Sequence, residues 1–253
     1  MYKRQPPVRK IGIYPTSGGE ARTFQIPSKN FWVALNDLRW LPDGSGISFC
    51  GTTSNETPGW EEGMKAYRLF HLDLNTGEWR TLTLDGGGYN RSEWRGDGQG
   101  YYYTRNMSAG KCDIVDKDIQ TGNERVLCGI EPGLYTLRCS RDYTKVAFST
   151  SLEGIEIIDT KTGEKLKEFE KFELSSWSPN GRYIMAQRGS KPSYHVISYA
   201  DGTSQEYDLS ENLPQGDRWY FDWSPLGNQV AFAFRLSQFD AYIVRNGIPA
   251  EKK

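Results

Sequence analysis

One pattern recurs four times along this chain: an aromatic residue ends a strand, a tight turn rich in Pro, Asp and Gly follows, and a short β-rich strand comes after the turn. The copies begin at Trp40, Trp94, Trp177 and Trp223, and a degenerate fifth copy begins at Cys139. A single unit of this size cannot bury its own hydrophobic face, so neighbouring units must stack. The repeat therefore constrains the fold more than any other feature of the sequence. We expect the four tryptophans to occupy equivalent positions and to pack between neighbouring units.

A second signature lies between the leading residues. The pattern Asp-x-x-Thr-Gly follows a short apolar strand at residues 73–77, 118–122 and 159–163, and a shortened version occupies residues 200–202. Thr-Gly between two β-rich runs predicts a hairpin turn whose glycine adopts a positive φ. We expect this conformation at Gly77, Gly122 and Gly163. The aspartate can accept hydrogen bonds from turn amides, so each unit reads as strand a, turn, strand b, variable loop, strand c, turn and strand d.

The two ends of the chain carry partial units. Residues 9–26 read as a hairpin of strands c and d, and residues 220–245 supply strands a, b and c. Four complete units lie between them, at about residues 36–84, 91–128, 135–170 and 174–209. We expect an all-β fold, a β-propeller of four-stranded antiparallel blades with five to six blades in total. It would form one domain over residues 9–248, with disordered or extended termini at 1–8 and 249–253.

Two architectures fit these partial ends. In one, the N-terminal hairpin supplies outer strands to the last blade and closes a ring of about five blades. In the other, the chain is the C-terminal part of a longer propeller whose N-terminal strands are missing. We favour the second, because a propeller closed by its own chain begins with a single closing strand rather than with a complete hairpin. An unclosed ring would also leave unpaired strand edges.

Composition excludes several classes of partner. The formal net charge is −1, and basic and acidic residues are interspersed, so no basic stripe predicts nucleic-acid binding. The longest apolar runs are the length of a strand, so we expect no membrane insertion by this segment and a monomeric domain. We interpret the four cysteines as thiols rather than disulfides, which favours a reducing compartment: Cys50, Cys112, Cys128 and Cys139.

Strand direction predicts which end of each blade binds partners. The a–b and c–d turns lie at one end and are stereotyped, whereas the b–c and d–a connections lie at the other end and vary in length. We expect a protein or a small ligand to bind at the variable end, with contacts from aromatic and Arg side chains: Trp60, Tyr89, Arg91, Arg218 and Trp219. Alternatively, the loop around Trp60 packs back on its neighbour, and the arginines are simply solvated.

The sequence offers little catalytic chemistry. His71 and His195, the only two histidines, fall within predicted strands and are too few for a histidine metal site. No Gly-x-Ser-x-Gly elbow is present. The repeated aspartates occupy turn-capping positions of different blades, which favours a structural role over calcium binding. We therefore expect no catalytic residues, no metal and no cofactor.

The turns resemble the PD40 (WD40-like) repeats of TolB-type bacterial β-propellers. The residues that carry this resemblance are Trp40–Gly44, Trp177–Gly181, Trp223–Gly227 and the Asp-x-x-Thr-Gly hairpins. The end of the chain is similar to the last blade of propellers that follow a kinase or DNA-binding domain in larger bacterial signalling proteins. The resemblance implies the propeller fold and suggests the periplasm, although no signal peptide is visible and the thiols leave the cytoplasm open. Departures are Gly96 and Arg141 for Pro, Cys139 for Trp, and Leu226 for Asp.

Two functional hypotheses follow. The first is a non-catalytic propeller that recognises a protein or ligand as the sensing or scaffold part of a larger bacterial protein. The alternative is the substrate-gating propeller of an S9 (prolyl-oligopeptidase-like) peptidase, separated from its hydrolase domain. The first is favoured because no linker to a hydrolase domain follows residue 248 in this sequence.

Overall fold

The computed structural model describes residues 10–13, 22–25, 32–33, 39–52, 68–82, 91–106, 112–130, 136–150, 154–189, 193–208, 218–223, 229–235 and 244–247. Their regular elements are all β-strands. The chain divides into two compact units, residues 1–126 and 127–253. The boundary between the units falls inside strand β11 (Glu124–Ile130).

The first unit begins with a two-stranded antiparallel sheet of β1 (Lys10–Ile13) and β2 (Arg22–Gln25). The next sheet contains β3 (Trp32–Val33), β4 (Arg39–Trp40), β5 (Gly46–Thr52), β6 (Arg68–Asp73) and β7 (Trp79–Thr81). Both β3 and β4 pair with β5, so they share the first position of this sheet. A four-stranded sheet follows, with β8 (Ser92–Trp94), β9 (Gly100–Asn106), β10 (Cys112–Asp118) and β11.

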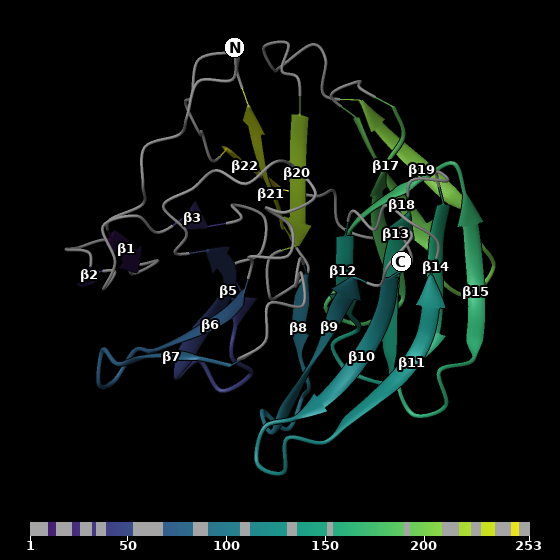
Figure 1. The fold of residues 1–253 in the computed structure, drawn as a ribbon. Coiled ribbons are helices and arrows are strands. Elements are labelled where there is room, and N and C mark those ends of the chain that lie inside the picture. Colours follow the sequence, from purple (N-terminus) through teal and green to yellow (C-terminus); the bar gives the residue numbers. More distant parts are fainter. Residues whose placement is uncertain are drawn as a thin grey trace, which may run out of the picture. The chain divides into compact units, whose positions relative to one another are not determined.

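The second unit contains three further sheets (Figure 1). The first has β12 (Thr136–Cys139), β13 (Lys145–Thr150), β14 (Gly154–Asp159) and β15 (Lys165–Glu170). The second has β16 (Glu173–Trp177), β17 (Tyr183–Gln187), β18 (Ser193–Ser198) and β19 (Ser204–Asp208). The third has β20 (Arg218–Trp223), β21 (Gln229–Arg235) and β22 (Val244–Gly247). Strands pair in sequence order and antiparallel, which confirms the predicted all-β class and the four-stranded blades.

Apolar side chains of neighbouring sheets form the core. In the second unit, Ile155 and Ile157 of β14 are fully buried and share one cluster with Leu174, Ile184 and Ile197 of the next sheet. Alternation along β14 accounts for this arrangement, because residues two apart lie on the same face of a strand. The sheet that contains β14 is thus covered by the sheet that follows it in the second unit, as expected for stacked repeats.

The register of strands a and b is the same at each of the five leading residues. Trp40 pairs with Ile47, Trp94 with Tyr101, Trp177 with Ile184 and Trp223 with Val230, and the degenerate Cys139 pairs with Val146 in the same way. In every copy the leading residue lies opposite the residue seven positions later. The four tryptophans therefore occupy equivalent backbone positions.

Burial of these tryptophans differs in one copy. Trp94 and Trp177 are buried, at 3% and 7% relative exposure, and Trp223 is half-buried. Trp40 is 56% exposed, so the expectation that all four indoles pack between neighbouring blades is wrong for this one. The physical reason is that each buried indole, of Trp94 and of Trp177, is covered by the sheet that precedes it in the sequence. Trp94 donates from Nε1 to the Ser48 hydroxyl at 2.8 Å.

The c–d turns have the expected glycine conformation, within a loop of four residues. Gly77, Gly122 and Gly163 have φ of 75°, 72° and 77°. The amide of Asp73 donates to the carbonyl of Glu78, and the amide of Gly77 donates to that of Asp73, both at 2.9 Å. The same two bonds recur at residues 118–123, 159–164 and 198–203. The loop therefore spans four residues, and the copy that looks shortened in sequence is complete.

Candidate functional site

The predicted contact residues are only partly described by the structure. Trp60 and Tyr89 lie outside the described residues. Arg91 immediately precedes β8 in the first unit; it is half-buried, and its carbonyl accepts a hydrogen bond from the Thr104 amide at 3.1 Å. Arg218 and Trp219 begin β20 in the second unit, where their backbones pair with Arg235 and Phe234. The binding role of these five residues remains a prediction.

The end of the blades that carries the a–b and c–d turns is stabilised by hydrogen bonds that recur from one blade to the next. In the a–b turns, Oδ1 of Asp43, Asp97 or Asp142 accepts the amide two residues later, at 2.9 to 3.1 Å. Asn180 accepts the Arg182 amide in the same way at 3.0 Å. These bonds hold the turns in shape, because a short carboxylate or amide side chain satisfies a backbone donor that the ladder leaves unpaired.

The c–d turns use their aspartates similarly. Oδ1 of Asp73 accepts the amides of Asn75 and Thr76, at 2.7 and 3.0 Å, and Asp159 accepts the two equivalent amides. These amide bonds lower the pKa of Asp73 below its usual value. Charged acceptors make the stronger hydrogen bonds. The repeated aspartates therefore anchor the turns, which is the structural role that the sequence predicted.

Two further carboxyls are strongly stabilised as anions. Burial raises the pKa of Asp142, but hydrogen bonds from the Ser140 hydroxyl and from the Thr144 amide and hydroxyl outweigh it and lower the pKa to about 2. The Thr203 amide, with the Ser198 and Thr203 hydroxyls, lowers the pKa of Asp201 to about 2. Both groups stay charged at neutral pH and hold their turns.

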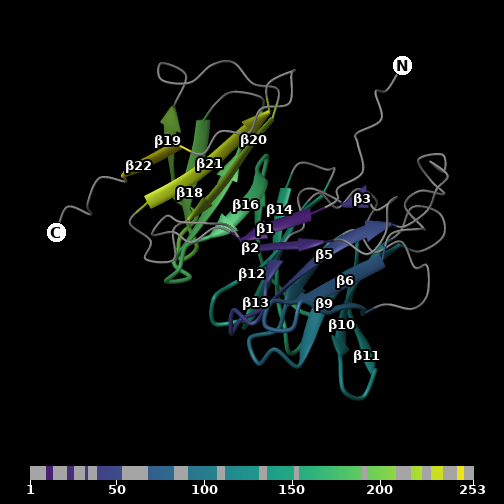
Figure 2. The same ribbon diagram turned by 90° about the vertical axis from the view of Figure 1, so that its left-hand side faces the viewer.

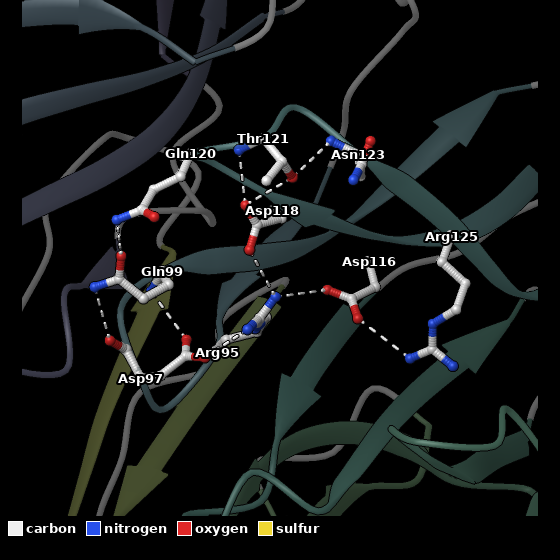
Figure 3. Close-up of polar contacts among 9 residues, drawn as sticks. All are labelled: Arg95, Asp97, Gln99, Asp116, Asp118, Gln120, Thr121, Asn123 and Arg125. Atoms are coloured by element: carbon white, nitrogen blue, oxygen red, sulfur yellow. Dashed lines mark hydrogen bonds and ion pairs between the residues drawn. The ribbon is translucent and has the colours of Figure 1, made fainter.

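One cluster at the end of the blade that carries these turns, around Arg95, was not predicted from the sequence (Figure 3). Arg95 follows the leading Trp94, where other copies have Ser140 or Ser178. Its guanidinium lies 2.5 Å from Asp97, 3.7 Å from Asp116 and 3.6 Å from Asp118. It thereby joins the a–b turn to strand β10 and the c–d turn. The signal in the sequence was this change from a small hydroxyl residue to arginine.

The Arg95 cluster is a self-contained charge network. Arg125 of β11 contacts Asp116 at 3.2 Å, and Gln99 and Gln120 bond to one another at 3.0 Å beside it. Because each carboxylate contacts a cation within the cluster, the network offers no vacant ligand set. Nor does any group of three or more His, Cys, Asp or Glu in the described ranges have an arrangement suited to a metal ion.

A cavity of about 330 Å³ lies in the second unit, between β11 and strands β13 to β15. Phe148 and Ile158 supply apolar lining, and Glu156 and Lys165 supply charge. Lys165 lies 3.2 Å from Glu156 and 2.5 Å from Glu168, and the hydrogen bond to Glu168 is the main reason that its pKa is raised. Cys128, a thiol rather than a disulfide, also lines the cavity.

Both histidines are strand residues with buried side chains, as predicted. His71 lies in β6, and its Nδ1 accepts a hydrogen bond from Nε of Arg80 at 3.0 Å. His195 lies in β18 with its ring 5.1 Å from that of Phe172. Among the residues that the structure describes, no helix has the length and apolarity to cross a membrane.

Comparisons with known proteins support the fold alone. No protein-family model matches the sequence, and no curated protein matches it. The structure is similar to TolB from Acinetobacter baumannii, with a TM-score of 0.59 and 16% identity over 90% of this chain and 52% of that one. It is also similar to hydrazine synthase from Kuenenia stuttgartiensis, with a TM-score of 0.54 and 18% identity over 79% and 55%. The chain spans about half the length of these structures, and its fold is of the TolB-like β-propeller type.

Proposed function

We propose that this protein is a non-catalytic propeller module that recognises a protein or a small ligand, as the sensing or scaffold part of a larger bacterial protein. The observation that supports this proposal is a difference between the two ends of a blade. At the end that carries the a–b and c–d turns, carboxylates anchor the turns by repeated hydrogen bonds, whereas the b–c and d–a loops at the other end vary in length. Rigid scaffolds of this kind bind through the loops that the repeat leaves free to vary.

The proposed binding surface is the variable-loop end, with contacts from five residues: Trp60, Tyr89, Arg91, Arg218 and Trp219. Aromatic and Arg side chains contribute most of the energy at recognition surfaces because they bury large areas and form directional bonds. The b–c loop of residues 51–66, which contains Trp60 and is longer than its counterparts in the sequence, would be part of this surface. Deleting residues 52–63 tests whether this loop contributes to binding or only covers a neighbouring blade.

Capture of a partner by two sets of variants tests this proposal. The first set changes the five contact residues to Ala. The matched control set changes Asn75, Gln120 and Lys161, which are exposed on the c–d turns. We expect only the first set to abolish capture, with unchanged melting temperatures in both. Loss of capture in the control set alone would place the functional surface at the turn end and refute the assignment.

We further propose that the chain has no hydrolase or lyase activity of its own. His71 and His195 are the residues to test, because general acid–base catalysis most often uses histidine. Their buried positions within strands β6 and β18 favour structural roles. Peptidase or lyase turnover by pure protein that disappears in His71→Ala or His195→Ala would overturn this proposal.

A further inference from the structure

The N-terminal hairpin β1–β2 has the register of the outer half of a complete blade. The blade used for comparison is the sheet of β12 to β15, in which β14 and β15 are strands c and d. Two cross-strand pairs of the hairpin have direct counterparts there: Ile11–Phe24 and Ile13–Arg22 match Ile155–Phe169 and Ile157–Lys167. Figure 2 shows β1 and β2 beside β5 and β6, and Ile11 shares a core cluster with Ile47 and Leu72.

The hairpin also contacts the following sheet as β15 contacts its own neighbour. A Cβ placed on Gly77 would lie 3.8 Å from the Phe24 ring, and one placed on Gly202 would lie 3.5 Å from the Phe169 ring. A basic side chain on the outer strand makes an equivalent hydrogen bond in both places. Arg22, two residues before Phe24, donates to the carbonyl of Leu74, three residues before Gly77. Lys167, two residues before Phe169, donates to the carbonyl of Tyr199, three residues before Gly202. The hairpin is therefore positioned as strands c and d of a blade.

A complete blade has inner strands that bury the next tryptophan. Trp177 donates from Nε1 to the carbonyl of Arg138 in β12 at 3.3 Å, and it shares a core cluster with Ala147 of β13. The hairpin forms a two-stranded sheet of its own among the described residues. Trp40 has the backbone position of Trp177 but is 56% exposed, against 7%. The exposed indole thus lies where strands a and b of the hairpin's blade would cover it.

The last sheet does not need the hairpin as its third strand. β22 already pairs with β21 at that position, through Phe232 and Val244 among others. Among the described residues, β22 thus occupies the strand-c position of that sheet. Because an edge strand exposes a row of unpaired amides and carbonyls, the outer edge of β1 is a template for another strand.

We propose that the indole of Trp40 and the outer edge of β1 form a docking surface for an antiparallel a–b strand pair of the same repeat type, carried by the polypeptide on the N-terminal side of residue 1. Strand b of this pair would bond to β1, as β13 bonds to β14. It would place a small side chain against Trp40, in the position of Ser48 and Ala147 in the complete blades. None of the five proposed contact residues belongs to this surface.

A graft tests the docking surface in the full chain. A copy of residues 136–150, which form β12 and β13, is placed before Met1, so that residues 1–9 become the b–c connection. A connection of this length adds little closure entropy. The matched control graft carries Ala147→Lys in the copy only, which places a charge where the indole must pack. Trp40→Phe in each background isolates the fluorescence of Trp40.

We expect the iodide quenching of Trp40 to fall severalfold in the graft and to stay unchanged in the control graft. The melting temperature should rise by at least about 4 °C in the graft alone. The β1 amides that point away from β2 should become protected from hydrogen exchange, which reports docking even if the fluorescence change is small. Unchanged quenching and exchange in a folded graft, or equal protection by the control graft, would overturn the proposal. So would concentration-dependent protection of Trp40 in the original chain, because the occupant would then be a second copy.

Discussion

Arg80 donates a hydrogen bond from Nε to Nδ1 of His71, at 3.0 Å, across the pair β6–β7. Neutral His71 must then carry its proton on Nε2. Burial and the nearby Arg80 charge lower the pKa of His71 to about 4. Because the folded pKa lies below that of an exposed histidine, the unfolded chain binds a proton more readily between pH 6.5 and pH 4.

The first prediction concerns this pH window. The contribution of neutral His71 to stability is complete above pH 6.5 and is lost as the pH falls to about 4. At about 1.4 kcal/mol per pKa unit, the loss is about 3 kcal/mol. Urea unfolding at pH 7, 5.5 and 4 measures it. His71→Gln removes the titrating group, so its stability should vary less over this range; an equally steep decline in that variant would contradict the assignment.

The second prediction compares two tryptophans at one repeat position. Trp177→Ala should lower the free energy of unfolding by about 3–5 kcal/mol, because it empties a buried aromatic site and removes the bond to Arg138. Trp40→Ala should cost less than about 1 kcal/mol, since its indole is mostly exposed. Chemical denaturation of both variants measures the difference. Equal costs would show that Trp40 is buried in solution.

The third prediction compares two turn glycines of similar φ. An alanine at either position pays about 1–2 kcal/mol for the left-handed conformation. A Cβ on Gly122 meets nothing within 4 Å, whereas one on Gly163 would lie 2.2 Å from the carbonyl oxygen of Leu127. Gly163→Ala should therefore cost about 1–3 kcal/mol more than Gly122→Ala. Thermal unfolding of the pair decides, and indistinguishable midpoints would contradict this contact.

The fourth prediction concerns the Arg95 cluster. Arg95→Met leaves Asp97, Asp116 and Asp118 without their shared cation, so we expect a loss of about 1–2 kcal/mol at pH 7. The loss should shrink at high salt, which screens repulsion between the carboxylates. Arg125→Met is the control; its side chain is 48% exposed and should contribute less than about 1 kcal/mol. Unfolding of both variants at low and high salt measures the effect, and a larger cost for Arg125 would refute the central position of Arg95.

The repeat predicted the fold well, because register is a local property. Trp94 and Trp177 fall in the same place because the same turn lies between the paired strands. The exposure of Trp40 could not be predicted from its own copy, since burial depends on strands of another blade. The Arg95 cluster was missed for a similar reason. Its aspartates come from separate turns and strands that meet only after folding.

Strand d of one sheet holds the c–d turn of the next. Lys167 in β15 bonds to Tyr199, and Phe169 lies against Gly202, both in the following hairpin. A substitution that distorts that hairpin should therefore also destabilise β15, in the preceding sheet. Replacing Gly202 with a bulky residue should speed amide exchange in β15, one sheet earlier, as well as in the hairpin itself. The contacts of Lys167 and Phe169 therefore couple the stability of β15 to a turn that lies one sheet later in the sequence.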